Sequence, residues 1–304
     1  MMADGRVMDG DSADFVARHR PGRDPGALAA QAEDRAGEMP RLCRSLAGRP
    51  GNLVPLAEDA LALAGLRQLL GQEDGPASLL RLGARAATAA GAAVASGAPL
   101  RVELGPPAPP GPVELPRGLQ RPAGLTPRRL VEACHAALAA RDRIALDLFA
   151  QVPVELIARQ PPAAEERIYG LAHARGLQAL LRGDAAGNQL LLQAIQGCND
   201  PALPLAARDY AQFIVSPEIE LALLHRDPDA AGFDKALRNA LVLHRRYWAD
   251  IQANPGEPQD SDPAGFIALG PLAWAAMRHD QGLPVGIRSD YLPGGMVDGS
   301  AQPA

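Results

Sequence analysis

This 304-residue chain contains five dipeptides in which proline follows a residue that commonly caps helices. The side-chain oxygen of Ser, Thr or Asp accepts a hydrogen bond from a free N–H of the first helical turn. Proline fits the first helical position, because the N–H that it lacks has no partner there. An apolar-periodic run follows each dipeptide, so the chain is predicted to be all-α. The five are Asp24-Pro25, Thr126-Pro127, Asp200-Pro201, Ser216-Pro217 and Asp262-Pro263.

Apolar residues recur at helical spacing along most of the chain. Short loops connect the runs, so successive helices should be antiparallel neighbours, and the predicted architecture is an irregular, repeat-like stack of helical hairpins. Pro40 is expected to kink or break the first helix. The expected helices cover residues 27–47, 53–70, 77–95, 127–140, 142–151, 154–158, 165–182, 187–196, 203–214, 217–225, 232–250 and 263–280.

One stretch alternates in the manner of a strand. Residues 100–104 alternate between apolar and polar, residues 112–116 nearly do, and a Gly/Pro-rich link separates the two. This pattern predicts a small β-hairpin near 100–116, which its prolines confine to an edge or a surface flap. An irregular linker is the alternative interpretation.

Aromatic residues are scarce, at 4% of the chain, and they concentrate in its second half. Before Phe149 the sole example is Phe15. Since aromatic side chains bury the most area each, the specifically packed core is expected in the second half.

The most distinctive polar-aromatic group is His244, Tyr247 and Trp248, which fall within about one turn of an expected helix. An amphipathic helix that buries these rings is one interpretation, and a partner-facing surface is the other. Asp290 and Tyr291 lie in a segment that is expected to fold back on the last helix, with Asp290 bonding backbone groups. These five residues are the candidate partner-binding residues.

Charge and cysteine content exclude several classes of protein. The net charge is −5, which argues against a general nucleic-acid binder. Cys43, Cys134 and Cys198 are odd in number and far apart, as expected for reduced, buried cysteines of a cytosolic protein. The first 14 residues lack the apolar run of a signal peptide, and residues 86–98 are too few to span a bilayer. We therefore expect a cytoplasmic protein that binds neither nucleic acid nor membrane.

No catalytic, cofactor-binding or metal-binding constellation emerges from the motifs. None of the six histidines lies in an HExxH motif or pairs with another at a ligand spacing. Cys134 and His135 are adjacent, so on a helix they point in different directions, and no GxSxG is present. The chain is therefore predicted not to be an enzyme and to need no cofactor.

From about residue 125 to 293 the chain resembles the immunity protein 49 family of bacterial polymorphic-toxin systems. The N-terminal half is similar only in layout. The residues that carry the resemblance are Arg141-Asp142, Val152-Pro153, Pro217-Glu218-Ile219-Glu220, Phe233, Ala240-Leu241, His244, Tyr247-Trp248, residues 265–272 (GFIALGPL), Gly282-Leu283-Pro284 and residues 289–293 (SDYLP).

The resemblance implies an all-α protein, encoded beside a toxin, that binds and neutralises that toxin without catalysis. No cofactor or catalytic residue comes with the family. The acidic balance would suit a basic toxin through charge steering. A helical-repeat scaffold that binds an unrelated cellular protein or peptide is the main alternative, and a metal-dependent hydrolase built from scattered His and Asp is a third. The Ala/Leu-rich first half leaves a homodimer open.

The predicted organisation is one helical domain, residues 25–293, between a disordered tail over 1–24 and a flexible tail over 294–304. The domain divides into an N-terminal helical half, 25–124, and a C-terminal half, 125–293, that carries the family resemblance. A Pro-rich segment at 105–124 and a polar loop at 254–261 depart from the family pattern. Toxin specificity could lie in these loops, because loops on a rigid scaffold tolerate change.

Overall fold

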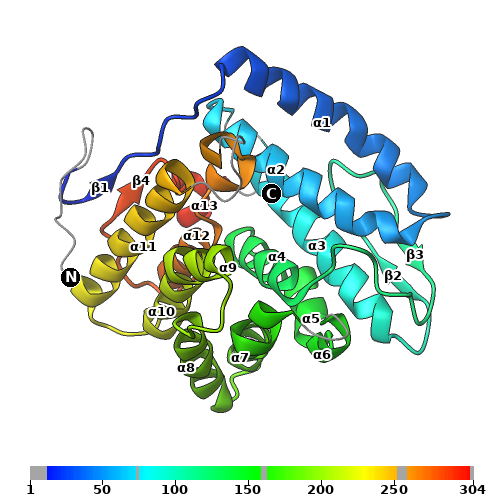
Figure 1. Ribbon diagram of the computed structural model, residues 1–304. Coiled ribbons are helices and arrows are strands. Elements are labelled where there is room, and N and C mark those ends of the chain that lie inside the picture. The colour runs from blue at the N-terminus through cyan, green and yellow to red at the C-terminus, as the bar shows by residue number, and fades with distance from the viewer. Residues whose placement is uncertain (1–11, 73–74, 159–162, 252–258, 302–304) are drawn as a thin grey trace.

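Helices make up most of the structure, as the sequence predicts (Figure 1). The computed structural model describes residues 12–72, 75–158, 163–251 and 259–301. The longer helices are α1 Pro25–Ser45, α2 Leu53–Leu69, α3 Pro76–Ala95, α4 Pro127–Ala139, α5 Arg143–Gln151, α7 Leu171–Leu181, α8 Ala186–Cys198, α10 Ser216–Leu224, α11 Ala230–Asp250 and α12 Leu269–Asp280. Short helical pieces are η1 Pro50–Asn52, α6 Val154–Ile157, η2 Glu166–Gly170, α9 Leu205–Tyr210, η3 Ala211–Val215, η4 Gln259–Ser261, η5 Pro263–Gly265 and α13 Gly294–Val297.

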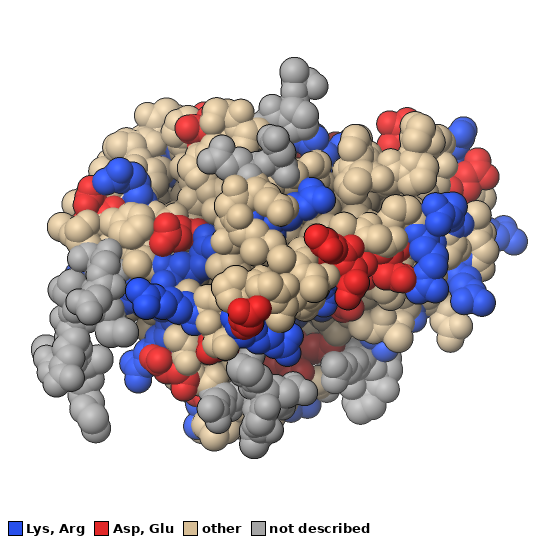
Figure 2. Space-filling view, turned by 90° about the horizontal axis from the view of Figure 1, so that it is seen from above, with Lys and Arg blue, Asp and Glu red and all other residues tan. Residues whose placement is uncertain are grey.

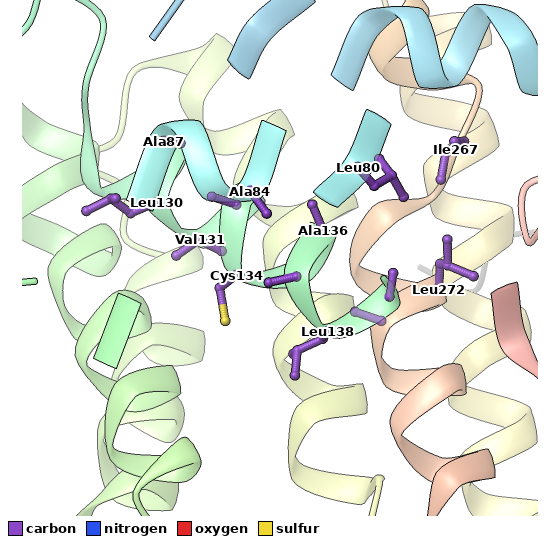
Figure 3. Close-up of a cluster of buried hydrophobic side chains, with 14 of the residues drawn as sticks. Leu80, Ala84, Ala87, Leu130, Val131, Cys134, Ala136, Leu138, Ile267 and Leu272 are labelled. Atoms are coloured by element: carbon purple, nitrogen blue, oxygen red, sulfur yellow. The ribbon is translucent and has the colours of Figure 1, made fainter. Parts of the chain in front are cut away.

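Helix α4 lies at the centre of the fold, where it contacts α3, α5, α7 and α12. Figure 3 shows Leu80 and Ala84 of α3 on one side of α4 and Leu272 of α12 on the other. The last long helix therefore packs against the first helix of the second half, so the stack does not simply follow chain order. One continuous hydrophobic core runs through both halves of the chain. The distribution of aromatic residues had predicted a specifically packed core in the second half alone.

Three of the five predicted helix starts are confirmed. Asp24 accepts a hydrogen bond from the Ala27 N–H at 3.2 Å, and Thr126 accepts one from the Arg129 N–H at 3.2 Å. Asp262 accepts one from the Ala264 N–H at 2.9 Å and begins η5. The α-helix predicted from residue 263 begins only at Leu269, because the chain between them turns to bring Gly265 against Trp248.

The other two predicted starts are wrong. Asp200-Pro201 lies in a turn, and the next helix begins at Leu205. Ser216-Pro217 lies inside a continuous helical path, because the π-helix η3 runs directly into α10 and Ser216 itself has helical dihedral angles. The change from π to α register falls at this proline, where its missing N–H interrupts the bonding pattern least.

Helix α1 continues through Pro40, so the predicted break is wrong. Pro40 is exposed, and water can satisfy the carbonyl that loses its partner there. The buried face of α1, which includes Leu28 and Met39, packs on α2. An ion pair between Arg35 and Asp59 also joins the two helices.

The predicted β-hairpin is confirmed. Strand β2 Leu100–Val102 pairs antiparallel with β3 Val113–Leu115, and Leu100 lies opposite Leu115. Val102 and Leu115 are buried, and β2 contacts α3. The hairpin is therefore attached to the helical core by one side.

Both predicted tails hold ordered structure. Strand β1 Phe15–Val16 pairs parallel with β4 Arg288–Ser289, and Ser289 Oγ donates a hydrogen bond to the Val16 carbonyl at 2.6 Å. Val16 is completely buried, so the prediction of a disordered tail is wrong from residue 12 onward, and residues 1–11 lie outside the described residues. Helix α13 likewise buries Met296, an apolar side chain within the predicted C-terminal tail. The single domain at 25–293 stays a prediction.

Cys43, Cys134 and Cys198 are buried and form no disulfide, as predicted. None of the described helices is long and apolar enough to cross a membrane.

Gly65 of α2 packs closely against the backbone of η5. A Cβ atom on Gly65 would lie 2.2 Å from the carbonyl oxygen of Pro263, and backbone cannot move aside as a side-chain tip can. We expect Gly65→Ala to lower the free energy of unfolding by about 2–3 kcal/mol, measured by urea denaturation. Gly37→Ala is the control: Gly37 is exposed in α1 with no atom within 4 Å of an added Cβ, so alanine there should stabilise by up to about 1 kcal/mol. Equal stability of the two variants would contradict this packing.

Candidate functional site

Two connected polar pockets lie where the two halves of the chain meet. The inner pocket has a volume of about 570 Å³ and lies between α2 and α4 on one side and η3, α10, α11 and η5 on the other. The outer pocket, of about 500 Å³, shares Arg128, Glu132 and Tyr210 with it. Both volumes are typical of small-molecule sites.

Two π-helical segments border the pockets. Segment η2 contributes Tyr169, and η3 contributes Ile214 and Val215. Each runs into an α-helix without a break, as an insertion of extra residues into a helical turn does. Such insertions are rare and often occur at functional sites.

An arginine–carboxylate network lines both the inner and the outer pocket. Glu132 accepts hydrogen bonds from Arg128 Nε at 3.0 Å and from Arg129 Nη1 at 2.5 Å. Arg129 also donates to Glu58 at 2.7 Å, and the Arg128 guanidinium lies 3.7 Å from the centroid of the Tyr210 ring. Burial opposes the ionisation of Glu132, but the two guanidinium groups outweigh it and lower its pKa. Glu132 is therefore a fixed carboxylate.

Glu218 lies deeper in the inner pocket, with its side chain 12% exposed. Burial, reinforced by the charge of Glu132, raises its pKa to about 8. His135 Nδ1 lies 3.9 Å from Glu218 Oε2, but burial lowers the pKa of His135 to about 4, so this histidine is neutral near pH 7. Burial likewise lowers the pKa of His173, whose ring centroid lies 6.1 Å from that of His135, to about 3.

Carboxyl groups outnumber arginines in the inner lining. Among the described residues it has three arginines, Arg35, Arg128 and Arg129, and five carboxyl side chains, Glu58, Asp59, Glu132, Glu218 and Asp262. Arginines pair with Asp59, Glu58 and Glu132, and Asp262 caps η5. Among the described residues Glu218 is the lining carboxyl that forms no salt bridge with an arginine, and it accepts a hydrogen bond instead from the backbone N–H of Gly270 in the first turn of α12.

Gly270, in the GFIALGPL run, lies directly against the side chain of Glu218. A Cβ atom on Gly270 would lie 2.3 Å from Cγ of Glu218. The run therefore brings α12 into direct contact with the Glu218 side chain.

The structure brings four of the five predicted partner-binding residues into one buried cluster. His244 Nε2 lies 3.0 Å from the Gly265 carbonyl, and its ring centroid lies 4.9 Å from that of Tyr291. The Tyr247 and Trp248 rings meet edge to face at 5.1 Å. All four side chains are buried, which supports the interpretation of an internal cluster.

Asp290 is the exposed member of the predicted set, and its Oδ2 accepts a hydrogen bond from the Arg18 N–H at 3.2 Å. The neighbouring Tyr291 carbonyl accepts one from Ala268 at 3.2 Å, so the segment does fold back on the start of α12. A partner-binding role for these five residues stays a prediction.

Sequence reasoning missed both pockets, because their residues come from many elements spread over most of the chain. One signal was present. Arg128, Glu132 and His135 follow one another at spacings of four and three, which places them on one face of α4. A polar face on a helix that is otherwise buried indicates an internal polar site. Within the described ranges, no group of three or more His, Cys, Asp or Glu side chains is placed to hold a metal ion.

The buried titratable groups predict that stability is greatest near pH 6.5. Folding lowers the pKa of His135 to about 4 and those of His173 and His244 to about 3, from 6.5. Below pH 6.5 the unfolded chain therefore binds protons that the folded chain excludes, and stability falls as the pH falls.

Glu218 affects the pH dependence of stability in the opposite direction to the three histidines. Its pKa rises from 4.5 to about 8 on folding, so the folded chain holds an extra proton and stability falls as the pH rises through 8. Each uncompensated proton gives a slope of up to about 1.4 kcal/mol per pH unit. Urea denaturation from pH 5 to 9 should show the maximum, and Glu218→Gln should flatten the alkaline side. A stability that rises steadily to pH 9 would contradict this assignment.

Residues 78–296 match a family model described as Immunity protein 49. The matched span runs from α3 into α13 and contains most of the elements that line the two pockets. The chain thus combines a helical fold with an immunity-protein signature over most of its length. It belongs to the Immunity protein 49 family. No curated protein and no solved structure shows significant similarity to it.

Proposed function

We propose that the protein binds one cognate toxin domain in the cytoplasm of the producing cell and neutralises it by occlusion, without catalysis. The observation that supports this most directly is the match to the Immunity protein 49 family over residues 78–296. An immunity protein protects the cell that makes the toxin, so it must meet the toxin where the toxin acts. The helical scaffold, with one continuous core, suits a preorganised binding surface that loses little entropy on association.

Charge on the surface gives a modest indication of the partner. Figure 2 looks down on the side where α1 lies and shows acidic and basic side chains interspersed, with no large field of one sign. The net charge of −5 favours encounter with a basic toxin domain, such as a nuclease, through charge steering. We expect this contribution to appear in the association rate and to weaken with added salt.

The segment at 105–124 is the proposed place of specificity. Much of it is exposed, and it includes the link between β2 and β3. Because the hairpin is anchored on α3 through its buried side, the link can vary without loss of the core. Exchange of this link with that of another family member should change which toxin is neutralised, while the thermal stability stays close to that of the parent.

The deciding experiment is co-expression with the toxin gene that neighbours this gene. We expect growth to be restored and the two proteins to co-purify as a 1:1 complex by size-exclusion chromatography with light scattering. A catalytically dead toxin should still bind, since occlusion needs no turnover. The same measurement on the free protein shows whether it forms a homodimer. Lack of both rescue and co-purification would refute the proposal.

A further inference from the structure

The inner pocket contains groups that toxin binding leaves unexplained. Glu218 forms no salt bridge with an arginine, and its carboxyl group accepts a hydrogen bond from the backbone N–H of Gly270 at the start of α12. The histidine beside it is neutral. One neutral donor leaves part of the hydrogen-bonding capacity of a carboxyl group unused, and burying that group costs free energy, because water solvates its charged form far better than the protein interior does.

Two buried imidazoles add hydrogen-bonding capacity that the described part of the chain does not use. His135 Nε2 and His173 Nε2 are buried and have no hydrogen-bond partner there. A neutral imidazole carries one N–H donor and one acceptor nitrogen. Both histidines line the inner pocket, so an occupant of the pocket can supply partners for the unused nitrogens.

Charge and shape favour a positive occupant. The lining has five carboxyl groups against three arginines, and each arginine is already engaged with a carboxylate. Trp248 and Tyr169 add aromatic rings to the lining, and the faces of such rings attract cations, as the Tyr210 ring already does for Arg128. The volume of about 570 Å³ accommodates a small molecule or a long side chain.

We infer that the inner pocket binds an organic cation rich in N–H donors, an alkylguanidinium or alkylammonium group, with its charge against Glu218 and its donors toward His135 and His173. Such a group gives the Glu218 carboxyl the charged partner that no arginine supplies, and it brings N–H donors to the unused imidazole nitrogens. It can belong to a free small molecule or to an arginine or lysine side chain of a bound protein. The inference does not depend on toxin neutralisation.

The pH dependence of binding follows from the surroundings of Glu218. Its carboxyl group loses its proton as the pH rises through about 8, so the affinity for a guanidinium group, which stays charged throughout, should rise with it. The other groups that act on Glu218 are Arg128, Glu132 and His135 of α4, Tyr210 of α9, Cys198 of α8 and the backbone N–H of Gly270 on α12. His135 is neutral across pH 7–9, since its pKa is about 4.

Calorimetric titration of the full-length protein with agmatine tests the inference. We expect saturable 1:1 binding that strengthens between pH 7 and 9, and no binding of n-butylurea, which has N–H donors on a similar chain but carries no charge. Glu218→Gln should weaken agmatine binding about tenfold or more, because it removes a charge-assisted contact. Glu220→Gln is the matched control: Glu220 lies on the same helix, is exposed and does not line the pocket, so it should bind as the parent does.

A second titration distinguishes the two sources. If an N-acetylated, C-amidated Gly-Arg-Gly peptide binds as agmatine does, the pocket admits a side chain of a partner protein. If agmatine alone binds, the ligand is a free small molecule. Binding of neither at millimolar concentration, or tighter binding of inorganic phosphate, would overturn the inference. Should Glu218→Gln fail to fold, the pH dependence of the unaltered protein still decides, because affinity that is flat from pH 7 to 9 contradicts it.

Discussion

Replacing Arg278 with methionine is expected to lower the free energy of unfolding by about 3–5 kcal/mol. Arg278 is completely buried near the end of α12, and no carboxylate in the described ranges pairs with it. Its Nε donates to the Pro284 carbonyl at 2.9 Å and its Nη1 to the Asp227 carbonyl at 2.6 Å. The guanidinium also lies 4.6 Å from the centroid of the Phe233 ring. Methionine would fill similar space but leave these carbonyls without donors.

Lysine at the same position separates the charge of Arg278 from its geometry. The Asp227 carbonyl lies just past the end of α10, where the helix dipole favours a positive charge. An ammonium group keeps that attraction, but it cannot donate along two directions in one plane as the guanidinium does. Arg278→Lys should therefore fall between the parent and Arg278→Met in urea denaturation followed by circular dichroism. A methionine variant as stable as the parent would show that the carbonyls find other donors.

Replacing Asp142 with alanine is expected to lower the free energy of unfolding by a similar amount, about 3–5 kcal/mol. The Asp142 side chain is 0% exposed, and its Oδ2 lies 2.6 Å from Arg85 Nε and 3.4 Å from Arg81 Nε. Its Oδ1 caps α5 by accepting a hydrogen bond from the Ala145 N–H at 3.1 Å. Alanine would remove the cap and leave two largely buried guanidinium groups without their carboxylate.

Two further variants divide this loss into its parts. Asp142→Asn keeps an oxygen for the cap and removes the charge, so it should be less destabilised than alanine. Asp229→Ala is the matched control, because Asp229 caps α11 by accepting a hydrogen bond from the Ala231 N–H at 3.1 Å and is exposed. It should lose only about 1 kcal/mol, the usual contribution of a cap. Equal losses for Asp142→Ala and Asp229→Ala in urea denaturation would rule out the buried ion pairs as the cause.

Arg141, the neighbour of Asp142 in the Arg141-Asp142 pair that resembles the family, also makes structural contacts. Arg141 adopts a left-handed backbone conformation, with φ of 52°, at the turn between α4 and α5. Its guanidinium pairs with Asp280 at 2.8 Å and donates to the Met296 and Val297 carbonyls. Together the two residues join α3, α5, α12 and α13 at one turn. Such a junction tolerates few substitutions.

Local chemistry accounts for the part of the fold that was predictable. Helical periodicity located most helices, and a capping side chain with a following proline located the starts at Pro25, Pro127 and Pro263. The alternation in 100–104 and 112–116 was sufficient for the hairpin. In these cases the determining contacts lie within a few residues of each other in the sequence.

The part of the fold that could not be predicted depends on contacts between residues far apart in the sequence. Strands β1 and β4 have two residues each, too few for any alternation, and each exists only because the other is beside it. The helix continues through Pro217 because a π-helical segment precedes it, and the amino-acid composition does not predict such a segment. The pocket draws Glu218 and His173 from different helices, so its polar character appears only after folding. The spacing of His244, Tyr247 and Trp248 placed their rings within one helical turn, but it left both burial and a partner-facing surface open.

The pairing of β1 with β4 has a consequence for how the chain folds. His19 donates from its backbone N–H to the Tyr291 hydroxyl across a separation of 272 residues, whereas α1, α2, α3 and α4 contact their neighbours in sequence. Closing so long a loop costs entropy that local helix pairing does not, so the local contacts should form first. During synthesis the segment around Phe15 must wait until residues 288–291 have been made. Refolding should accordingly end with a slow step in which this segment docks, long after the helices have formed.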